Sequence, residues 1–399
     1  MVLGFLLARA GVEVIVLEKH ADFLRDFRGD TIHPSTLDVL YELGLLKEFL
    51  ALPHNEVREL GGRIGDNDVI IGDFSHVPTR CKFIALMPQW DFLNFLAEKA
   101  KQFPTFHLLT KTKAVDLIWN DAGDHVLGVR ASDEGGDSEI LADLIVGADG
   151  RHSVVREKAG LKIIDIGAPM DVLWMRFPRK TDDPYRTFGS FRGGHIFVQL
   201  NRETYWQCAF VIEKGGFDQI KAKGIEAFHK ELLELAPYLG ERVNEIKSFD
   251  DVSLLTVTVD RLEQWRKPGL LCIGDSAHAM SPIGGVGINL AIQDAVATAN
   301  LLATPLLNKT LTEADLAKVQ RRRSFPTRAT QKLQVVAQNR IISPVLARGN
   351  RPSAKKSLPP LLRLMNAFPV LRRIPARIVG VGFRPEHVHS PAHLKSNLA

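Results

Sequence analysis

The first third of the chain alternates amphipathic helical spacing with short apolar runs. Residues 1–11 have the spacing of a helix that ends at a glycine, and residues 12–17 form a β-branched, nearly all-apolar run. Such a run predicts a strand buried in a parallel sheet. Glu18 follows it directly, and this order is typical of the second half of a βαβ dinucleotide-binding unit, whose acid holds ribose hydroxyls. An accidental helix–strand–acid order is the alternative interpretation.

The first half of such a unit contains a strand and a glycine-rich turn, which places a helix N-terminus on a pyrophosphate. The sequence starts at Met1, inside or at the edge of the predicted helix. Gly4 fits the small residue that lets such a helix pack closely on its sheet. We therefore expect either a start codon assigned too late or a truncated product.

The most specific pattern lies near residue 280. A short apolar strand, residues 269–273, leads into Gly274 and Asp275. Pro282 and glycines at 284, 285 and 287 follow, and an alanine-rich helical pattern begins at Asn289. This order presents backbone N–H groups and a helix dipole to an electron-rich ligand. Asp275 is placed to accept hydrogen bonds from hydroxyls of a ribose or ribitol.

A second strand, residues 142–146, ends at the string Gly147-Ala148-Asp149-Gly150-Arg151, and a helix is predicted to begin near Ser153. Open α/β sheets bind ligands at the carboxyl ends of their strands, so Asp149 and Arg151 are candidate ligand contacts. The alternative is a strand-to-helix turn in which the aspartate hydrogen-bonds locally.

The sequence pattern changes between residues 161 and 260, where strand-like segments alternate with turns. We predict strands at 172–177, 195–200, 205–212 and 252–259, which form an antiparallel sheet in a second, inserted domain. The predicted domains are 1–160, the first part of the ligand-binding domain; 161–260, the inserted sheet; 261–320, the second part; and 321–399, a basic helical region.

Composition and charge add two expectations. Three widely separated cysteines, Cys81, Cys208 and Cys272, lack metal-ligand spacing and predict a cytoplasmic protein with reduced thiols and no metal site. From residue 320 onward there are 16 Lys+Arg and one acid, Glu386, which leaves 51 − 16 = 35 basic and 46 − 1 = 45 acidic residues elsewhere. Such a tail suits anionic lipid, nucleic acid or an acidic face of the same protein. Residues 358–383 mix apolar side chains with arginines, so we expect peripheral membrane contact and no nucleic-acid partner.

These motifs resemble those of the FAD-dependent aromatic hydroxylases, the single-component flavoprotein monooxygenases similar to para-hydroxybenzoate hydroxylase. The resemblance rests on residues 147–151, 274–278 and 284–289, together with Glu18 and Arg28. It implies an α/β (mixed α+β) fold: a three-layer, Rossmann-like FAD-binding domain lacking its N-terminal strand and glycine-rich loop, an inserted antiparallel-sheet substrate domain, and a C-terminal helical region.

By this resemblance, the cofactor-binding residues are Glu18, Arg28, Gln89, Asp149, Gly150, Arg151, Gly274, Asp275, Pro282, Gly285, Gly287, Ile288 and Asn289. Glu18 would bind the adenosine ribose, and Arg28 and Gln89 would lie along the diphosphate and ribityl chain. Asp149 would belong to a motif shared by FAD and the nicotinamide donor, and Asp275 would hold ribityl hydroxyls. Pro282 and the backbone of 284–289 would cradle the isoalloxazine ring.

Several of these residues also fit structural roles that involve no cofactor. Arg28 also fits a surface arginine beside a turn, and Gln89 also fits a cap of the helix at 92–100. His278 is near enough in sequence to Asp275 to be considered as a base, but a structural role is the favoured interpretation. No catalytic acid–base residue is expected, because the flavin performs the oxygen chemistry.

The implied activity is hydroxylation of an aromatic or other apolar ring with NADPH or NADH and O2, through a C4a-hydroperoxyflavin. Family members that bind aromatic carboxylates use arginines in the inserted domain, and we place none beside Tyr205-Trp206-Gln207. The expected substrate is therefore a small apolar or phenolic compound. The alternatives are a flavin-dependent reductase, dehydrogenase or halogenase of the same fold, and a truncated, non-enzymatic homologue unable to bind FAD.

Overall fold

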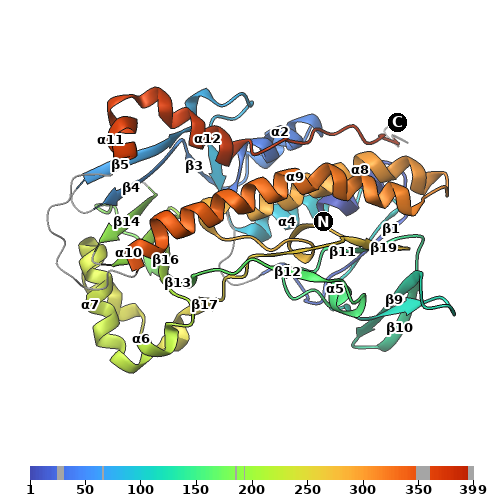
Figure 1. Ribbon diagram of the computed structural model, residues 1–399, viewed down its shortest axis with the longest axis horizontal. Coiled ribbons are helices and arrows are strands. Elements are labelled where there is room, and N and C mark those ends of the chain that lie inside the picture. The colour runs from blue at the N-terminus through green and yellow to red at the C-terminus, as the bar shows by residue number, and fades with distance from the viewer. Residues whose placement is uncertain (25–30, 65–66, 185–186, 193, 347–359, 394–399) are drawn as a thin grey trace.

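The computed structural model describes residues 1–24, 31–64, 67–184, 187–192, 194–346 and 360–393. It has the mixed α/β architecture that the sequence predicts. Two long helices, α8 (Gly287–Leu307) and α9 (Glu313–Ala337), pack against each other and run along the molecule (Figure 1). A large, mostly antiparallel sheet lies at one end and a small antiparallel one at the other.

The predicted N-terminal helix and strand are both present. Helix α1 (Val2–Arg9) contacts α8 and α4 (Gln89–Ala100), and β1 (Val14–Leu17) pairs in parallel with β7 (Phe106–Leu109). Gly4 sits where α1 crosses the strand, because a Cβ added there would lie 2.8 Å from Cγ2 of Val16. The side chains of this region form one core with α4 and the inner face of α8.

A separate small sheet supplies the carboxyl edge on which the candidate ligand residues lie. Its order is β11 (Ile145–Gly147), β20 (Leu270–Cys272) and β19 (Arg266–Lys267), and β11 pairs in parallel with β20. All three residues of β20 are buried, as a strand with a neighbour on each side requires.

The inserted region forms most of a seven-stranded sheet, in the order β17-β13-β16-β15-β14-β4-β5. Its strands are β17 (Ser253–Leu255), β13 (Met170–Pro178), β16 (Tyr205–Glu213), β15 (His195–Asn201), β14 (Phe188–Arg192), β4 (Glu59–Ile64) and β5 (Asn67–Asp73). Three predicted strands fall within two residues of the observed ones, whereas the predicted strand at 252–259 is a strand only at β17. The sheet also includes β4 and β5 from the first third of the chain, with β4 parallel to β14. The domain bounds themselves stay a prediction.

The remaining elements cover these sheets and connect them. The helices are α2 (Pro34–Glu42), α3 (Leu46–Phe49), α5 (Val154–Lys158), α6 (Phe217–Lys223) and α7 (Ile225–Leu235). The strands are β2 (Thr31–Ile32), β3 (Asn55–Val57), β6 (Ile84–Leu86), β8 (Lys113–Trp119), β9 (Val126–Asp133), β10 (Gly136–Leu141), β12 (Ile163–Asp165) and β18 (Asp260–Leu262).

The C-terminal region is helical, as predicted, and folds back on the rest of the protein. It contains α10 (Ser343–Leu346), α11 (Pro360–Ala367) and α12 (Arg373–Gly380). Residues 381–393 then return toward the start of the chain, where His393 N donates a hydrogen bond to Arg9 O at 2.8 Å. Residues 283–307, which include α8, are apolar and long enough to cross a membrane, but most of this segment is buried in the protein.

Candidate functional site

Asp275 is the point at which an otherwise buried segment reaches the surface. Every residue from 270 to 281 is buried except Asp275, which is half-buried. It lies in the turn after β20, and Gly147 of β11 pairs with Cys272 of β20. Because the two strands are parallel, Asp149 and Asp275 emerge at the same edge of this sheet, as open α/β sheets place ligand contacts.

Asp149 already has a local structural partner at this edge. Its carboxylate accepts hydrogen bonds from Ser153 Oγ at 2.5 Å and from Val155 N at 3.2 Å, which fastens the start of α5. Gly150 has a φ of +85° with nothing within 4 Å of a Cβ placed on it, and Arg151 donates to Thr256 O at 3.1 Å. The structure therefore supports the local interpretation of Asp149, and its contact with a cofactor stays a prediction.

The glycine loop between Pro282 and α8 adopts backbone conformations that favour glycine. Gly284 and Gly285 have φ values of +78° and +63°. Thr31 Oγ1 donates to Gly285 O at 2.9 Å, and a Cβ on Gly285 would lie 2.5 Å from that hydroxyl oxygen. Gly285 is thus required both by its conformation and by the approach of β2.

We expect Gly285→Ala to lower the free energy of unfolding by about 1–3 kcal/mol, because left-handed strain and a steric clash act together. Gly123→Ala is the matched control, since Gly123 has a φ of +71° with no atom within 4 Å of its added Cβ. Urea denaturation measures both. Equal losses for the two variants would show that the contact with Thr31 contributes nothing.

The N-terminus of α8 can accept an electron-rich group. No side chain caps this helix among the described residues, and Gly287 and Ile288 are only half-buried. The first N–H groups of a helix have no intrahelical acceptor, and the helix dipole favours negative charge there. Uncapped amides, a left-handed glycine loop and the nearby Asp275 carboxylate together fit the ring and the ribityl chain of a flavin.

Asn289, a predicted cofactor contact, has a fully engaged side chain. Its Oδ1 accepts hydrogen bonds from His33 N at 2.9 Å and Thr36 Oγ1 at 2.8 Å, and its Nδ2 donates to Thr31 O at 3.1 Å. These bonds attach α2 and β2 to the start of α8. Asn289 can therefore meet a cofactor through its backbone, while its side chain holds the loop in place.

His278 lies inside the protein in a charged network. Its Nε2 is 2.6 Å from Oδ2 of Asp294, which also accepts from Gly274 N at 3.1 Å. Arg323 Nε donates to the other carboxylate oxygen at 2.8 Å, and Arg323 Nη1 donates to Glu386 Oε1 at 3.2 Å. His278 is 1% exposed, and its contacts fit the structural role favoured from the sequence.

The negative charge of Asp294 is held in this interior by its partners. Burial alone would raise the pKa of Asp294, but His278 and Arg323 outweigh burial and lower it. Sequence reasoning missed Asp294, Arg323 and Glu386. The signal was present in Asp294, a lone acid in an alanine-rich helical pattern, because a buried charge requires a partner.

Two other predicted cofactor residues, Glu18 and Gln89, belong to other elements than the Asp275 turn. Glu18 follows β1 in the other parallel sheet, where its carboxylate accepts from His20 N at 3.0 Å. Gln89 is the first residue of α4 and half-buried, so it begins this helix rather than preceding it as a cap. Arg28 lies outside the described residues. The roles of all three stay predictions.

One face of the seven-stranded sheet is an apolar wall that includes the glycine loop. Trp174, Phe191 and Val198 are half-buried on this face and share a hydrophobic cluster with Ile283. Farther along, Gln207 pairs in register with Arg176, and Gln207 Oε1 accepts from Arg202 Nε at 2.9 Å. The sequence placed no arginine beside Gln207, whereas the fold brings two there from β13 and from the turn before β16.

Comparisons with known proteins identify the family of this chain. A family model described as FAD binding domain matches residues 1–332. The chain is 31% identical over 347 residues to 6-methylpretetramide 4-monooxygenase of Streptomyces rimosus, covering 86% of this chain and 82% of that protein. It is 24% identical to para-nitrophenol 4-monooxygenase of Pseudomonas sp. (strain WBC-3), covering 80% of this chain and 79% of that one.

Solved structures share the fold. PqsL, a probable FAD-dependent monooxygenase from Pseudomonas aeruginosa, aligns with a TM-score of 0.73 at 21% identity, over 87% of this chain and 94% of that one. OxyS anhydrotetracycline hydroxylase from Streptomyces rimosus aligns with a TM-score of 0.71 at 23% identity, over 95% and 73%. The chain therefore belongs to the FAD-binding domain family, among the FAD-dependent aromatic hydroxylases.

Proposed function

We propose that this protein hydroxylates a neutral aromatic ring with FAD, a nicotinamide donor (NADPH or NADH) and O2. One oxygen atom enters a ring C–H bond, the other leaves as water, and the nicotinamide supplies two electrons. The observation that carries the proposal is the partly exposed Asp275 beside an uncapped α8 N-terminus. Relatives of this chain that are named as aromatic monooxygenases also support the proposal.

Different residues of the site would bind FAD and orient it. Bound FAD supplies the activation of O2. Asp275 would accept hydrogen bonds from the ribityl hydroxyls, and the first amides of α8 would stabilise negative charge on the flavin. Asn289 keeps these amides in place by attaching them to α2 and β2. No side chain is required to carry a proton to the substrate.

The apolar wall gives the reason for choosing a neutral substrate. Trp174, Phe191 and Val198 offer an apolar, half-buried surface next to Ile283, and exclusion of water protects a reactive oxygen-transfer site from side reactions. Arg176 and Arg202 near Gln207 favour the competing class, aromatic carboxylates, if the ring binds at that end.

The test is a titration of the purified 399-residue chain with FAD, followed by NADPH and NADH oxidation with panels of phenols and benzoates under ¹⁸O2. We expect a perturbed flavin band and ¹⁸O in a hydroxylated phenol. Product formation only with halide and a separate reductase would assign a halogenase, and nicotinamide oxidation without ¹⁸O in product would assign a reductase. A clear preference for benzoates would overturn the neutral substrate. Absence of flavin binding would favour the alternative of a non-enzymatic homologue.

We also propose that the C-terminal helices contact anionic membranes peripherally. Leu364, Phe368, Val370 and Ile374 of α11, α12 and their connection are 46–59% exposed. Arg372 and Arg373 lie among them, in a segment whose net charge is strongly positive. Exposed apolar side chains next to arginines are the pattern that inserts at a lipid interface and is drawn to acidic headgroups.

We expect Phe368→Ser with Ile374→Ser to weaken binding to vesicles of phosphatidylcholine and phosphatidylglycerol by about tenfold or more, because two apolar side chains lose their burial in lipid. Leu141→Ser with Ile163→Ser is the control, since both are exposed apolar residues on distant strands. Co-sedimentation at low and high salt measures the effect. Absence of binding to anionic vesicles at low salt would exclude the contact.

A further inference from the structure

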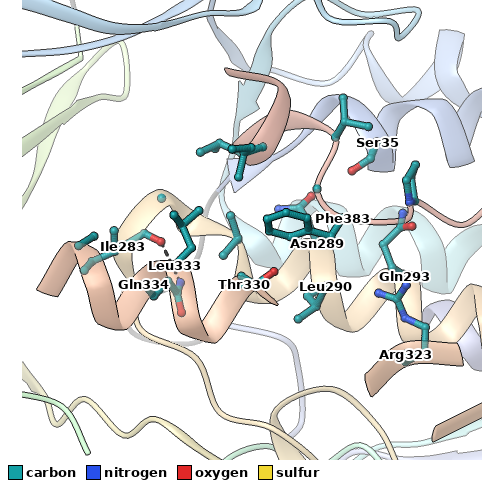
Figure 2. A pocket seen from close by; sticks show the side chains of 18 residues that line it. Ser35, Ile283, Asn289, Leu290, Gln293, Arg323, Thr330, Leu333, Gln334 and Phe383 are labelled. Atoms are coloured by element: carbon teal, nitrogen blue, oxygen red, sulfur yellow. Dashed lines mark hydrogen bonds between the residues drawn. The ribbon is translucent and has the colours of Figure 1, made fainter. Parts of the chain in front are cut away.

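A cavity of about 170 Å³ lies between α8, α9 and the segment that follows α12. Figure 2 shows its lining, which runs from Ile283 at one end to Gln293 and Arg323 at the other. Most of the lining is apolar and includes Leu290, Leu333 and Phe383. Leu333 is 42% exposed, so the cavity reaches the protein surface along α9.

This cavity borders the glycine loop of the candidate flavin site, since Gly284 and Asn289 line it, but it lies away from the Asp275 turn. It is lined by Asn289, Leu290 and Gln293 of α8 and by Val286 just before that helix, and this spacing places all four on one face. The turn that holds Asp275 packs on another face, because a Cβ on Gly274 would lie 2.9 Å from Cβ of Ala291. The cavity and the Asp275 turn are therefore separated by the body of α8.

Two buried donors in the cavity wall have no acceptor among the described residues. They are Nη2 of Arg323 and Nε2 of Gln293, whose residues are 1% and 4% exposed. The rest of each side chain is engaged: Gln293 Oε1 accepts from Glu386 N, and Arg323 Nε and Nη1 donate to Asp294 and Glu386. A buried donor without an acceptor costs about 1–3 kcal/mol, so this end of the cavity favours an oxygen atom.

The surrounding charges determine whether a charged or a neutral oxygen acceptor fits this end of the cavity. The buried Arg323 already pairs with two carboxylates, Asp294 and Glu386, and Glu386 also pairs with Arg322, whose side chain is 41% exposed. A bound anion would add an uncompensated buried charge, which is expensive, whereas a neutral acceptor adds none. The wall thus selects a carbonyl or hydroxyl oxygen over a carboxylate.

We propose that this cavity binds a neutral, single-ring aromatic compound whose carbonyl or hydroxyl oxygen accepts hydrogen bonds from Arg323 and Gln293. The size agrees, since an apolar cavity of about 150 Å³ holds benzene. Binding here requires neither the flavin nor turnover, so it can be tested separately from the hydroxylation proposed above.

The probes are three compounds of similar shape: acetophenone, isopropylbenzene and benzoate. We expect acetophenone to bind about fivefold to tenfold more tightly than isopropylbenzene, the effect of one to two net hydrogen bonds, and benzoate to bind most weakly. Ligand-observed NMR titrations on the purified chain, with and without FAD, measure the three affinities. Intermolecular NOEs from the acetophenone ring to methyl groups of Leu290 and Val379 locate the site in the unmodified protein.

Ala337→Phe fills the cavity, because Ala337 lines it, and is expected to abolish acetophenone binding. Val336→Phe is the control: Val336 neighbours it on α9, is 45% exposed and does not line the cavity. The proposal is overturned if acetophenone binds no better than isopropylbenzene, as when a water satisfies both donors. It is also overturned if the NOEs come from Trp174 or Val198, which belong to the apolar wall of the sheet. The NOE result decides the matter should Ala337→Phe fail to fold.

Discussion

Asp294→Ala is expected to cost about 3–5 kcal/mol of unfolding free energy, the largest effect of any single substitution proposed for this protein. Asp294 is 0% exposed and bonds Arg323 Nε, the imidazole of His278 and the backbone of Gly274. Removing it leaves a buried guanidinium short of one carboxylate and frees the turn next to Asp275. Urea denaturation measures the loss.

Two comparisons separate charge from shape. Asp294→Asn keeps the volume and an oxygen acceptor, so a loss close to that of alanine identifies the charge as the cause. Glu139→Ala breaks the Arg130–Glu139 pair, whose side chains are 57% and 59% exposed, and is expected to change stability by about 0–1 kcal/mol. A loss for Asp294→Ala no larger than this control would mean that the network contributes little.

The same carboxylate sets a pH dependence. Its pKa is lowered in the folded protein, so its contribution is present above the unfolded value of about 4 and is lost as the pH falls toward the folded pKa. The unmodified protein should therefore lose stability below about pH 4 more steeply than Asp294→Asn. Chemical denaturation between pH 3 and 6 provides the comparison; parallel curves would contradict it.

Asp275→Ala is expected to raise the Kd for FAD by about tenfold to a hundredfold. A carboxylate that accepts hydrogen bonds from hydroxyls contributes about 1.5–3 kcal/mol, and nothing else in residues 270–281 reaches the surface to replace it. Titration of the flavin absorbance band, or of flavin fluorescence, measures the Kd.

The Kd of Asp275→Asn for FAD should fall between the Kd of the unmodified protein and that of Asp275→Ala, because asparagine keeps one carbonyl acceptor without the charge. Asp137→Ala serves as the control because Asp137 is an exposed aspartate on β10, in a different sheet. An unchanged Kd for Asp275→Ala, with a folded protein by circular dichroism, would remove Asp275 from the cofactor site.

Much of this site could be predicted because its signals are local. A buried apolar strand, an acid at its end, glycines with left-handed φ and a long helix occupy one continuous stretch, and each has a sequence preference of its own. Strand β20, the Asp275 turn and α8 follow in that order in the structure. The helix α1 and strand β1 were predicted for the same reason.

Contacts between distant segments could not be predicted in this way. Arg323 is 29 residues from Asp294, and Glu386 is 63 residues from Arg323. The pairing of β4 with β14 joins residues more than a hundred positions apart. The backbone periodicity of one segment does not specify its distant partner, so these contacts are visible only in the fold. Asn289 illustrates the difference, because its position was predicted while its bonds to His33 and Thr36 were not.

The return of residues 381–393 to α1 has a consequence for how the protein folds during synthesis. Residues around Arg9 acquire their contacts with Ser390 and His393 only after a stretch of chain about 381 residues longer has been made. Contacts of such high sequence separation slow folding, because the chain loses the entropy of closing a long loop before the stabilising contacts form. The apolar surface of α1 stays exposed until those segments arrive, and exposed apolar surface is prone to aggregate and attracts chaperones. Slower, cooler expression should increase the yield of folded chain.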